Sequence, residues 1–593
     1  MKVAASHLAH LESSGLIQLA EAEPDLAYLF RHALVQDSAY ASLLVQDRIA
    51  LHRAAGETLE RLYADQLTEF APVLGRHFSQ AGDDARALPY FIMAGDSAAQ
   101  MYANREASDH YAEVLTIIRQ DYKHLKAEDL EQFFARYGRT LELSGRYDEA
   151  LTLYQEMHTL AVSQNNQSLE LAALVALATV HAVPTAKYDP LQSESFAQQA
   201  LVLARKLEDC AAEAKILWSL MLVNLFAGNV EIAVDYGEAS LAIARNLDLR
   251  EQLAYTLNDL QRGYLGSGDF KKSKEALQEA SQLWEEIGNK PMQADSLGNS
   301  VILHYILGEP EEGLATSDQG YQISQSIGNR WGQAHNLAMV GNIYWELGNP
   351  TLAIKKMDEC LDLAEQVGFI TPQVATRAGL AWVYGNLGQI EQGFALAQLA
   401  SDCAEASLPS WLSWPMTIKA RLHIMKGQFE EAEKIVARYP NALEELNGSL
   451  APFLVTFTRS ELDLHRHRYA AGIARLNEFL SLVGNLGARV FRKDVLYLKG
   501  CLLLRQQNLD EAARTLNASY QESKALKARY LLWQILFELG QVELLQNQLD
   551  TAHNYFEEAR SVINNIALNI EDPNLRASFL GLPNVQAVLY SPV

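Results

Sequence analysis

The chain has 593 residues, 49% of them hydrophobic, and a formal net charge of −24 at pH 7. This apolar content excludes wholesale disorder, and the negative charge disfavours binding to nucleic acid or to anionic lipid over most of the surface. Four separated cysteines (Cys210, Cys360, Cys403 and Cys501) form no CxxC pair, so we interpret them as buried core thiols in a reducing compartment.

The first 66 residues carry a helix followed by a β-hairpin. We expect a helix from Val3 to Ser14 and two short strands, Leu16–Leu19 and Ala27–Phe30, on either side of an acidic turn. A helix followed by a β-hairpin is typical of the end of a winged-helix domain. This segment has five Lys or Arg and nine acids, a net charge of −4, which disfavours DNA binding.

A six-residue turn then recurs along most of the chain. Its best copies are GRYDEA from Gly145, GDFKKS from Gly268 and GQFEEA from Gly427. Weaker copies begin at Ala186, Gly228, Gly308, Gly348, Gly388, His467, Gln507 and Asn547. Successive starts are 39 to 42 residues apart. A fixed period of this length predicts a helical solenoid.

Residues 331–368 show how one repeat is built. Apolar and small residues recur three and four positions apart up to Leu347, and Gly348-Asn349-Pro350 then ends the first helix and begins the second. We expect the small residues Gly341 and Ala353 to let the two helices of this hairpin approach closely.

This pattern resembles the tetratricopeptide repeat, with Gly341, Tyr344 and Ala353 at the small, aromatic and small consensus positions. The resemblance implies an all-α, right-handed superhelix of about twelve hairpins of about 40 residues. The expected division is a winged-helix remnant with a connecting helix over 1–66, the superhelix over 67–566, and a C-terminal cap over 567–593.

The two ends resemble signal-transduction ATPases with numerous domains, including regulators similar to the maltose-regulon activator. Phe30, His32, Leu34, Tyr40 and Leu51-His52-Arg53 carry this resemblance at the N-terminal side. Pro573, Arg576, Phe579, Leu580 and Pro583 carry it at the C-terminal side. No GxxxxGK[ST] phosphate-binding loop occurs in the sequence. We therefore interpret the chain as the C-terminal half of such a regulator, either a fragment or a stand-alone protein that lacks the ATPase, and an ATPase module in cis or in trans is one candidate partner.

The resemblance also implies a partner-binding groove on the first helices of the hairpins. The groove positions fall on Lys215, Trp218, Tyr255, Asn258, Arg262, His335, Asn342, Trp345, Trp382, Trp414 and Arg421. Aromatic, Arg and Asn side chains anchor peptides by stacking and by hydrogen bonds. Trp345 and Trp382 are the expected anchors, and the alternative is that all these side chains pack between helices.

The sequence therefore favours a non-catalytic interaction scaffold or sensor arm that takes a protein, a peptide or a small inducer. We expect no catalytic residues, no cofactor, no metal site, no nucleic-acid or membrane partner, and a cytoplasmic location, because no signal peptide is present. Arg31 and His32 are nucleotide-sensor candidates by resemblance, with helix capping by His32 as the alternative. Two other functions stay open: a regulator that binds DNA through the winged helix, or the regulatory half of a cyclase or of a Ser/Thr kinase.

Overall fold

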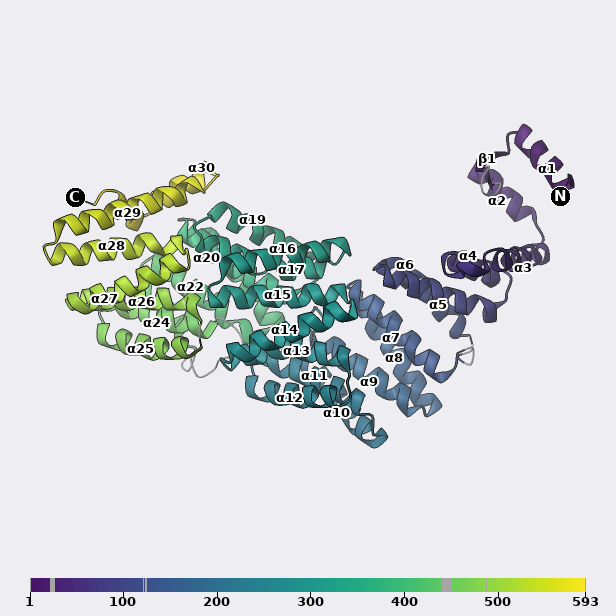
Figure 1. Ribbon diagram of the computed structural model, residues 1–593, viewed down its shortest axis with the longest axis horizontal. Helices are drawn as coiled ribbons and strands as arrows, with labels where there is room; N and C mark the ends of the chain where they lie inside the picture. The colour runs from purple at the N-terminus through teal and green to yellow at the C-terminus, as the bar shows by residue number, and fades with distance from the viewer. Residues whose placement is uncertain are drawn as a thin grey trace. The chain divides into compact units, whose positions relative to one another are not determined.

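The computed structural model describes residues 2–21, 27–120, 122, 125–439, 451–486 and 488–591. The chain divides into two compact units, Met1–Ser144 and Gly145–Val593, which we call the N-terminal and C-terminal units. Both are built almost entirely of helices (Figure 1). The expected all-α repeat fold is confirmed, while the expected domain limits at residues 66 and 566 stay a prediction.

The N-terminal unit begins with a helix and a two-stranded antiparallel sheet, as expected from the sequence. Its elements are α1 (Lys2–Ser13), β1 (Ile17–Glu21), β2 (Ala27–Phe30), α2 (Ala33–Ser42), α3 (Val45–Leu62), the 3-10 turn η1 (Ala64–Gln66), α4 (Leu67–Gln80), α5 (Asp84–Gln100), α6 (Asn104–Ile118) and α7 (Ala127–Leu143). Ile17 pairs with Phe30 and Leu19 with Tyr28 across the sheet. Among the described side chains up to residue 66, only Ile17 and Gly56 are buried. Whether this segment is a winged helix stays a prediction.

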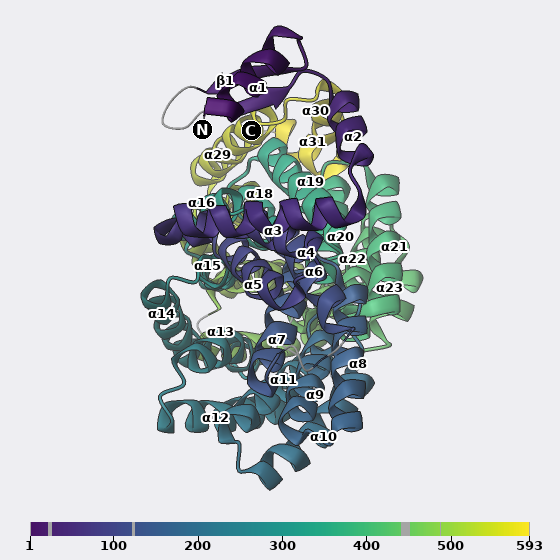
Figure 2. The ribbon, with the colours of Figure 1, turned by 90° about the vertical axis from the view of Figure 1, so that its right-hand side faces the viewer.

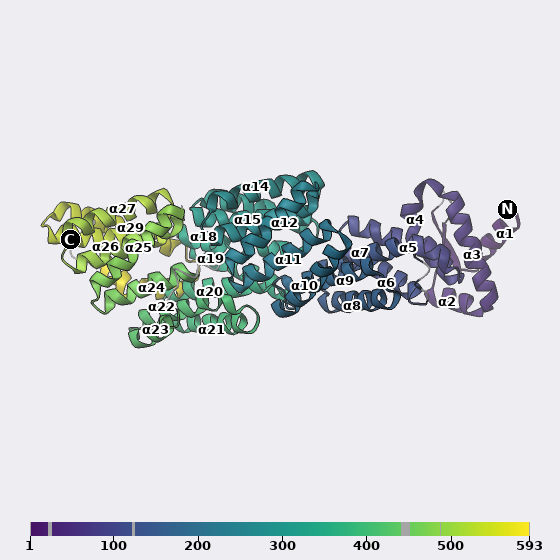
Figure 3. The same cartoon turned by 90° about the horizontal axis from the view of Figure 1, so that it is seen from below.

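The C-terminal unit is a series of antiparallel helix pairs that begins after α8 (Tyr147–Gln164). The first helices of the pairs are α9 (Gln167–Ala182), α11 (Cys210–Ala227), α13 (Arg250–Gly266), α15 (Lys290–Leu307), the divided helix α17 and α18 (Arg330–Leu337 and Val340–Glu346), α20 (Ile370–Asn386), α22 (Ser413–Met425), α24 (Ala451–His465), α26 (Arg489–Arg505) and α28 (Arg529–Leu545). Each first helix packs against the next along the series, so that α20, α22 and α24 lie side by side (Figure 3).

Each second helix packs against the first helix of its own pair. The second helices are α10 (Pro190–Leu207), α12 (Val230–Asn246), α14 (Phe270–Ile287), α16 (Pro310–Ser326), α19 (Pro350–Gln366), α21 (Ile390–Ser407), α23 (Phe429–Val436), α25 (Tyr469–Leu486), α27 (Leu509–Ala525) and α29 (Leu549–Leu568). The 3-10 turn η3 (Pro409–Trp411) precedes α22, and α30 (Pro573–Leu580) and α31 (Pro583–Leu589) follow α29.

The recurring turn of the sequence marks residues in the left-handed region of φ. All the glycines that begin a predicted turn have φ between 71° and 89°, and His467, Gln507 and Asn547 have φ of 58°, 64° and 58° at the equivalent positions. These residues end first helices and let the chain reverse into the second helix. The copy at Ala186 is the exception, because a longer loop joins α9 to α10 there.

The non-glycine turns offer a stability test. A side chain at a left-handed position costs about 1–2 kcal/mol, so Gln507→Gly is expected to raise the free energy of unfolding by about 1 kcal/mol. Gly427→Ala is the matched reverse change: a Cβ there meets no atom within 4 Å, so any loss reports backbone strain alone. Urea denaturation of both variants measures the two effects, and a destabilised Gln507→Gly would contradict this account of the turns.

Small residues set the distance between paired helices, as expected for the repeat at 331–368. A Cβ on Gly341 would lie 2.3 Å from Met357 Cγ and 2.9 Å from the carbonyl oxygen of Ala353. The structure differs from expectation in one respect, since the first helix of this pair is interrupted between Leu337 and Val340. The amide of Asn336 donates to the carbonyl of Gly332 in its own helix and to that of Ala294 in α15, and the interruption follows directly after it.

The C-terminal repeats pack back onto the middle repeats of the same unit. Helix α26 contacts α15, and α28 contacts α18. The side chain of Asn569 donates to the carbonyl of Gly348 (3.1 Å), and Lys527 pairs with Glu311. Residues more than 140 positions apart thus meet, because the row of first helices curves round on itself.

Two short helices cover the last hairpin. Phe579 of α30 and Val585 and Val588 of α31 are buried in a core that they share with α28, α29 and α19. Figure 2 shows α30 and α31 beside α19. The carboxylate of Asp572 accepts hydrogen bonds from the first backbone N–H groups of α30 and so fixes where the segment turns.

Within the described residues, α11 is the one helix long and apolar enough, by length and composition, to cross a membrane. Its most apolar stretch is 61% buried in the protein, among side chains of α9, α12 and α13. Cys210 at its first turn is exposed and Cys403 on α21 is half-buried, which corrects the expectation that every cysteine is buried. A first-turn residue points outward there because the apolar face of α11 begins only at Ala214.

Candidate functional site

The eleven predicted groove residues all lie on first helices of the C-terminal unit. They are distributed over α11 (Lys215, Trp218), α13 (Tyr255, Asn258, Arg262), α17 (His335), α18 (Asn342, Trp345), α20 (Trp382) and α22 (Trp414, Arg421). Lys215 is exposed, and the other ten are buried or half-buried. The structure gathers most of them into two groups, a polar network and an aromatic cavity.

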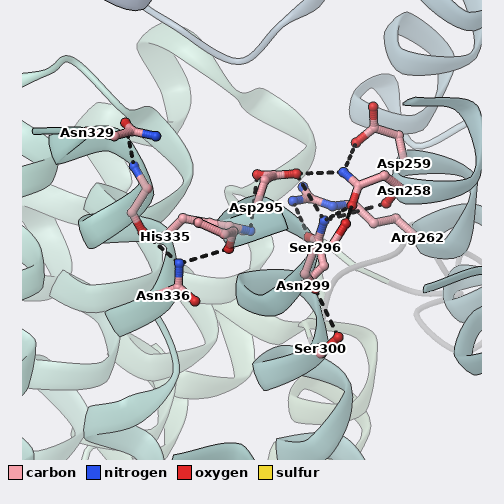
Figure 4. A network of polar contacts seen from close by, with 12 residues as sticks. Asn258, Asp259, Arg262, Asp295, Ser296, Asn299, Ser300, Asn329, His335 and Asn336 are labelled. Atoms are coloured by element: carbon pink, nitrogen blue, oxygen red, sulfur yellow. Dashed lines mark hydrogen bonds and ion pairs between the residues drawn. The ribbon is translucent and has the colours of Figure 1, made fainter. Parts of the chain in front are cut away.

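The polar network centres on Asn258, which is fully buried (Figure 4). Its amide donates to Asp295 Oδ2 (2.5 Å), and its oxygen accepts from Ser296 Oγ (2.6 Å). Arg262 Nη2 donates to Asn299 Oδ1 at 2.8 Å. These bonds join α13 to α15. Asn258 and Arg262, which were predicted to contact a partner, therefore hold neighbouring hairpins to each other.

Two titratable groups flank Asn258. The indole Nε1 of Trp218 donates to Asp259 Oδ2 (2.9 Å). Burial, and next the negative charge of Asp295, raise the pKa of Asp259 to about 7. Burial lowers the pKa of His335 to about 4, and its Nε2 lies 3.7 Å from Asp295 Oδ1. The network is therefore sensitive to proton binding near neutral pH through Asp259 rather than through its histidine.

This pKa predicts a pH dependence of stability. An unfolded Asp titrates near 3.9, so the folded protein binds an additional proton at Asp259 between about pH 4 and pH 7. The stabilisation from this bound proton is complete below about pH 4 and is lost as the pH rises through 7. The loss in unfolding free energy is about 1.4 kcal/mol for each unit by which the folded pKa exceeds the unfolded pKa. Asp259→Asn stays neutral at every pH, so it does not lose this stabilisation. The melting temperature of the variant minus that of wild type is therefore expected to be more positive at pH 8 than at pH 5. An equal difference at both pH values would contradict the assignment.

The second group surrounds a partly open cavity of about 90 Å³, lined mainly by first helices. Five predicted groove residues line it: Asn342, Trp345, Trp382, Trp414 and Arg421. Further aromatic side chains complete the wall: Tyr305, Phe453, Phe457, Phe479, Phe491 and Tyr530. They come from α15, α18, α20, α22, α24, α25, α26 and α28, so the cavity exists because the C-terminal repeats return to α15 and α18.

Arg421 is held between two aromatic rings on one side of the cavity. Its guanidinium carbon lies 3.8 Å from the centre of the Trp382 ring and 4.8 Å from that of Phe457. Its Nε pairs with Glu461 Oε2 at 3.2 Å. The guanidinium plane covers an indole and keeps a charge partner, a combination that favours a fixed rather than a mobile arginine.

A buried ion cluster adjoins the cavity through Glu346 and Asp494 of its wall, and no sequence pattern indicated it. The ammonium of Lys493 on α26 lies 2.6 Å from Asp494 Oδ2 and 3.0 Å from Glu346 Oε2 on α18. Tyr530 donates to the other oxygen of Asp494 (2.7 Å). Burial lowers the pKa of Lys493, but the two carboxylates outweigh it and hold that pKa above its usual range. Burial raises the pKa of Glu346 despite Lys493.

Trp345 lines the cavity beside Glu346 of this cluster. Its side chain is 6% exposed, and its ring centre lies 5.4 Å from that of Tyr530. Its indole Nε1 is buried and has no hydrogen-bond partner. A buried N–H without a partner costs roughly 1–3 kcal/mol, so the packing of the indole outweighs this cost.

The remaining sequence candidates are not brought together by the structure. Arg31 and His32 are exposed on the N-terminal unit, and His32 precedes α2 without a side-chain capping bond, so the capping alternative is not observed. Across the described residues, no group of three or more His, Cys, Asp or Glu side chains could hold a metal ion.

The comparisons with known proteins agree with the repeat. The model of the tetratricopeptide repeat matches residues 334–367, which are the second half of α17, α18 and all of α19. This segment is a tetratricopeptide repeat. The hairpin expected from residues 331–368 is thereby confirmed.

Among solved structures, three similar chains share little sequence identity with this one. One is a Rap protein complexed with competence and sporulation factor (13% identity, 61% of this chain and 99% of that chain, TM-score 0.46). Another is the APC/C hetero-tetramer Cut9–Hcn1 (12%, 85% and 94%, TM-score 0.44). A third is a signal-transduction ATPase with numerous domains and a tetratricopeptide repeat sensor from Pyrococcus horikoshii (15%, 63% and 57%, TM-score 0.37). The search of curated proteins found no match.

Proposed function

We propose that this chain is a non-catalytic interaction scaffold that binds a protein or peptide partner on the inner face of its first helices. Trp382 and Arg421 are the proposed partner contacts, since both are half-buried at the wall of the aromatic cavity. The observation that carries the proposal is the meeting of five predicted groove residues at one cavity. Helical solenoids commonly bind along the surface formed by their repeats.

The larger protein system in which the scaffold acts is proposed from the resemblance of the two ends of the chain to signal-transduction ATPases. The chain would serve as the sensor arm of a cytoplasmic signal-transduction ATPase of bacterial type, with the ATPase module supplied in cis or in trans. Regulation of transcription through the N-terminal unit is the second candidate, but the net charge of −4 over residues 1–66 disfavours DNA binding. A role as the regulatory half of a cyclase or kinase also fits a scaffold, because the proposal assigns no catalysis to this chain.

The test is partner capture by Trp382→Ala. We expect the tagged full-length variant to melt close to wild type and to capture partners from a lysate of the source organism at least tenfold less well, as for an interface anchor. Trp331→Ala is the matched control, because Trp331 is also half-buried but stacks on Phe369 away from the cavity.

Two outcomes would contradict the proposal. Capture that survives Trp382→Ala would remove the inner face as the binding surface. Reproducible turnover of ATP or another nucleotide by the purified chain, abolished by a point mutation within it, would contradict the non-catalytic role.

A further inference from the structure

The joint between α2 and α3 in the N-terminal unit is short and lightly packed. Leu43 and Leu44, which separate the two helices, both have extended backbone angles (φ −72° and −63°, ψ 139° and 148°). All ten residues of α2 are described, and none of them is buried. The position of α2 against α3 therefore depends on side-chain contacts at its surface rather than on a core.

Tyr40 of α2 contacts α3 through both its ring and its hydroxyl. The ring meets the ring of His52 edge-on, with centres 5.8 Å apart, and the guanidinium carbon of Arg48 lies 5.3 Å from the Tyr40 ring centre. The hydroxyl of Tyr40 lies 3.0 Å from His52 Nε2. Tyr40 and His52 are among the residues that carry the N-terminal resemblance, and the proposed scaffold function does not use them.

A second hydrogen bond extends this contact to α4. His52 Nδ1 lies 2.9 Å from His77 Nδ1. A hydrogen bond between two imidazole nitrogens needs one proton between them, so one Nδ1 donates and the other accepts. A pair that is neutral, or that carries one additional proton, meets this condition. When both rings are protonated, two N–H groups face each other and the bond is lost.

The cations around the pair disfavour the second proton. Burial, and next the charges of His52 on α3 and Arg76 on α4, lower the pKa of His77. Arg48, which lies over the ring of Tyr40, is a further cation on α3. A second imidazolium would therefore be placed among like charges, which disfavour the charged form of a histidine.

The carboxylates of α3 that face α5 are bonded to α5 rather than to either imidazole. Arg86 of α5 pairs with Glu57 (3.1 Å) and with Glu60, and the hydroxyl of Tyr90 also donates to Glu60. The direction of the pH response follows from the lowered pKa of His77. The contact is complete above the usual imidazole pKa of 6.5 and is lost as the pH falls through the lowered pKa.

We propose that Tyr40, His52 and His77 form a proton-dependent latch, which holds α2 to α3 and α4 at neutral pH and releases it in acid. On release, β2 and α2 would turn about the two-residue joint. This motion would displace the nucleotide-sensor candidates Arg31 and His32 relative to the helices that follow. The inference goes beyond the proposed function, since it concerns the N-terminal unit and involves no partner.

The test measures the distance between α2 and α4 in the full-length protein by double electron–electron resonance. Nitroxide labels are attached at Gln36→Cys and Gln80→Cys, two exposed and uncharged positions, after Cys210 and Cys403 are changed to serine. EDTA is present throughout, because histidines also bind transition metals. We expect one narrow distance distribution at pH 8 and an additional broad component at pH 5. The ratio of narrow to broad component is expected to fall by up to about tenfold for each unit by which the pKa of His77 is lowered.

Three variants distinguish the latch from a general effect of acid. Tyr40→Phe keeps the ring and loses the hydroxyl, so the broad component is expected already at pH 8. His77→Asn keeps a hydrogen-bonding group near the position of Nδ1 but does not titrate, so the narrow distribution is expected at both pH values. His10→Asn, which replaces an exposed histidine on α1, is the matched control and is expected to respond as wild type does.

The inference would be overturned by an unchanged wild-type distribution from pH 8 to pH 5, by opening of His77→Asn in acid, or by a narrow distribution in Tyr40→Phe. Far-ultraviolet circular dichroism of the same samples is expected to show no loss of helix at pH 5. A loss in wild type would also overturn the inference, because the opening would then be unfolding. If His77→Asn does not fold, the responses of wild type and Tyr40→Phe still decide.

Discussion

Replacing Lys493 with alanine is expected to lower the free energy of unfolding by about 3–5 kcal/mol. The side chain is fully buried, and its removal leaves the carboxylates of Glu346 and Asp494 together without a cation. Loss of one partner from a buried ion cluster is costly because the remaining charge cannot regain water. Urea denaturation followed by tryptophan fluorescence measures the change.

An exposed ion pair between the same parts of the unit provides the control. Lys527 pairs with Glu311, and both side chains are more than half exposed, so Lys527→Ala is expected to change stability by at most about 1 kcal/mol. The double change Lys493→Ala with Glu346→Gln is expected to recover part of the loss, since one buried carboxylate is removed. A Lys493→Ala protein as stable as wild type would show that the cluster does not hold α26 against α18.

Truncation after Asp572 is expected to reduce stability by about 5 kcal/mol and to cause aggregation. It removes Phe579, Val585 and Val588, each of which is almost completely buried, and burial of such a side chain contributes about 1.5–3 kcal/mol. It also exposes the apolar surface of α29 that the short helices cover, and terminal repeats need such a cover to stay soluble. Thermal melting and size-exclusion chromatography measure the two effects.

A surface residue of the same segment is the matched control. Tyr590 follows α31 and is 76% exposed, so Tyr590→Ala is expected to stay within about 0.5 kcal/mol of wild type. An unchanged melting curve of the truncated chain would show that α30 and α31 are dispensable for the last hairpin.

The repeats were predictable because their signals are local. A glycine such as Gly348 needs only its neighbours to end one helix and begin the next, and Gly341 reports the close approach of the helix directly after it. The turns at His467, Gln507 and Asn547 were also predicted correctly. The repeat period located these turns, although none of the three residues is a glycine. Ala186 failed because its loop has a different length and conformation.

The site was only partly predictable. Register placed Trp345, Trp382 and Arg421 on the inner face, but no local pattern indicates that Lys493 lies against Glu346, 147 residues earlier in the chain. That contact depends on the curvature accumulated over several hairpins, to which each repeat adds a small rotation. No local pattern indicates the interruption after Leu337 either, or the hydrogen bond that Asn336 donates to the preceding repeat beside it.

The return of α26 and α28 onto α15 and α18 has a consequence for how the chain folds. In an open solenoid each repeat contacts only its neighbours, so unfolding can proceed repeat by repeat from an end. Contacts such as Asn569 with Gly348 raise the contact order and join the middle and last hairpins into one cooperative unit. During synthesis the middle hairpins would be made before the C-terminal hairpins that cover them. Their aromatic inner face would be exposed until then and would depend on chaperones for protection.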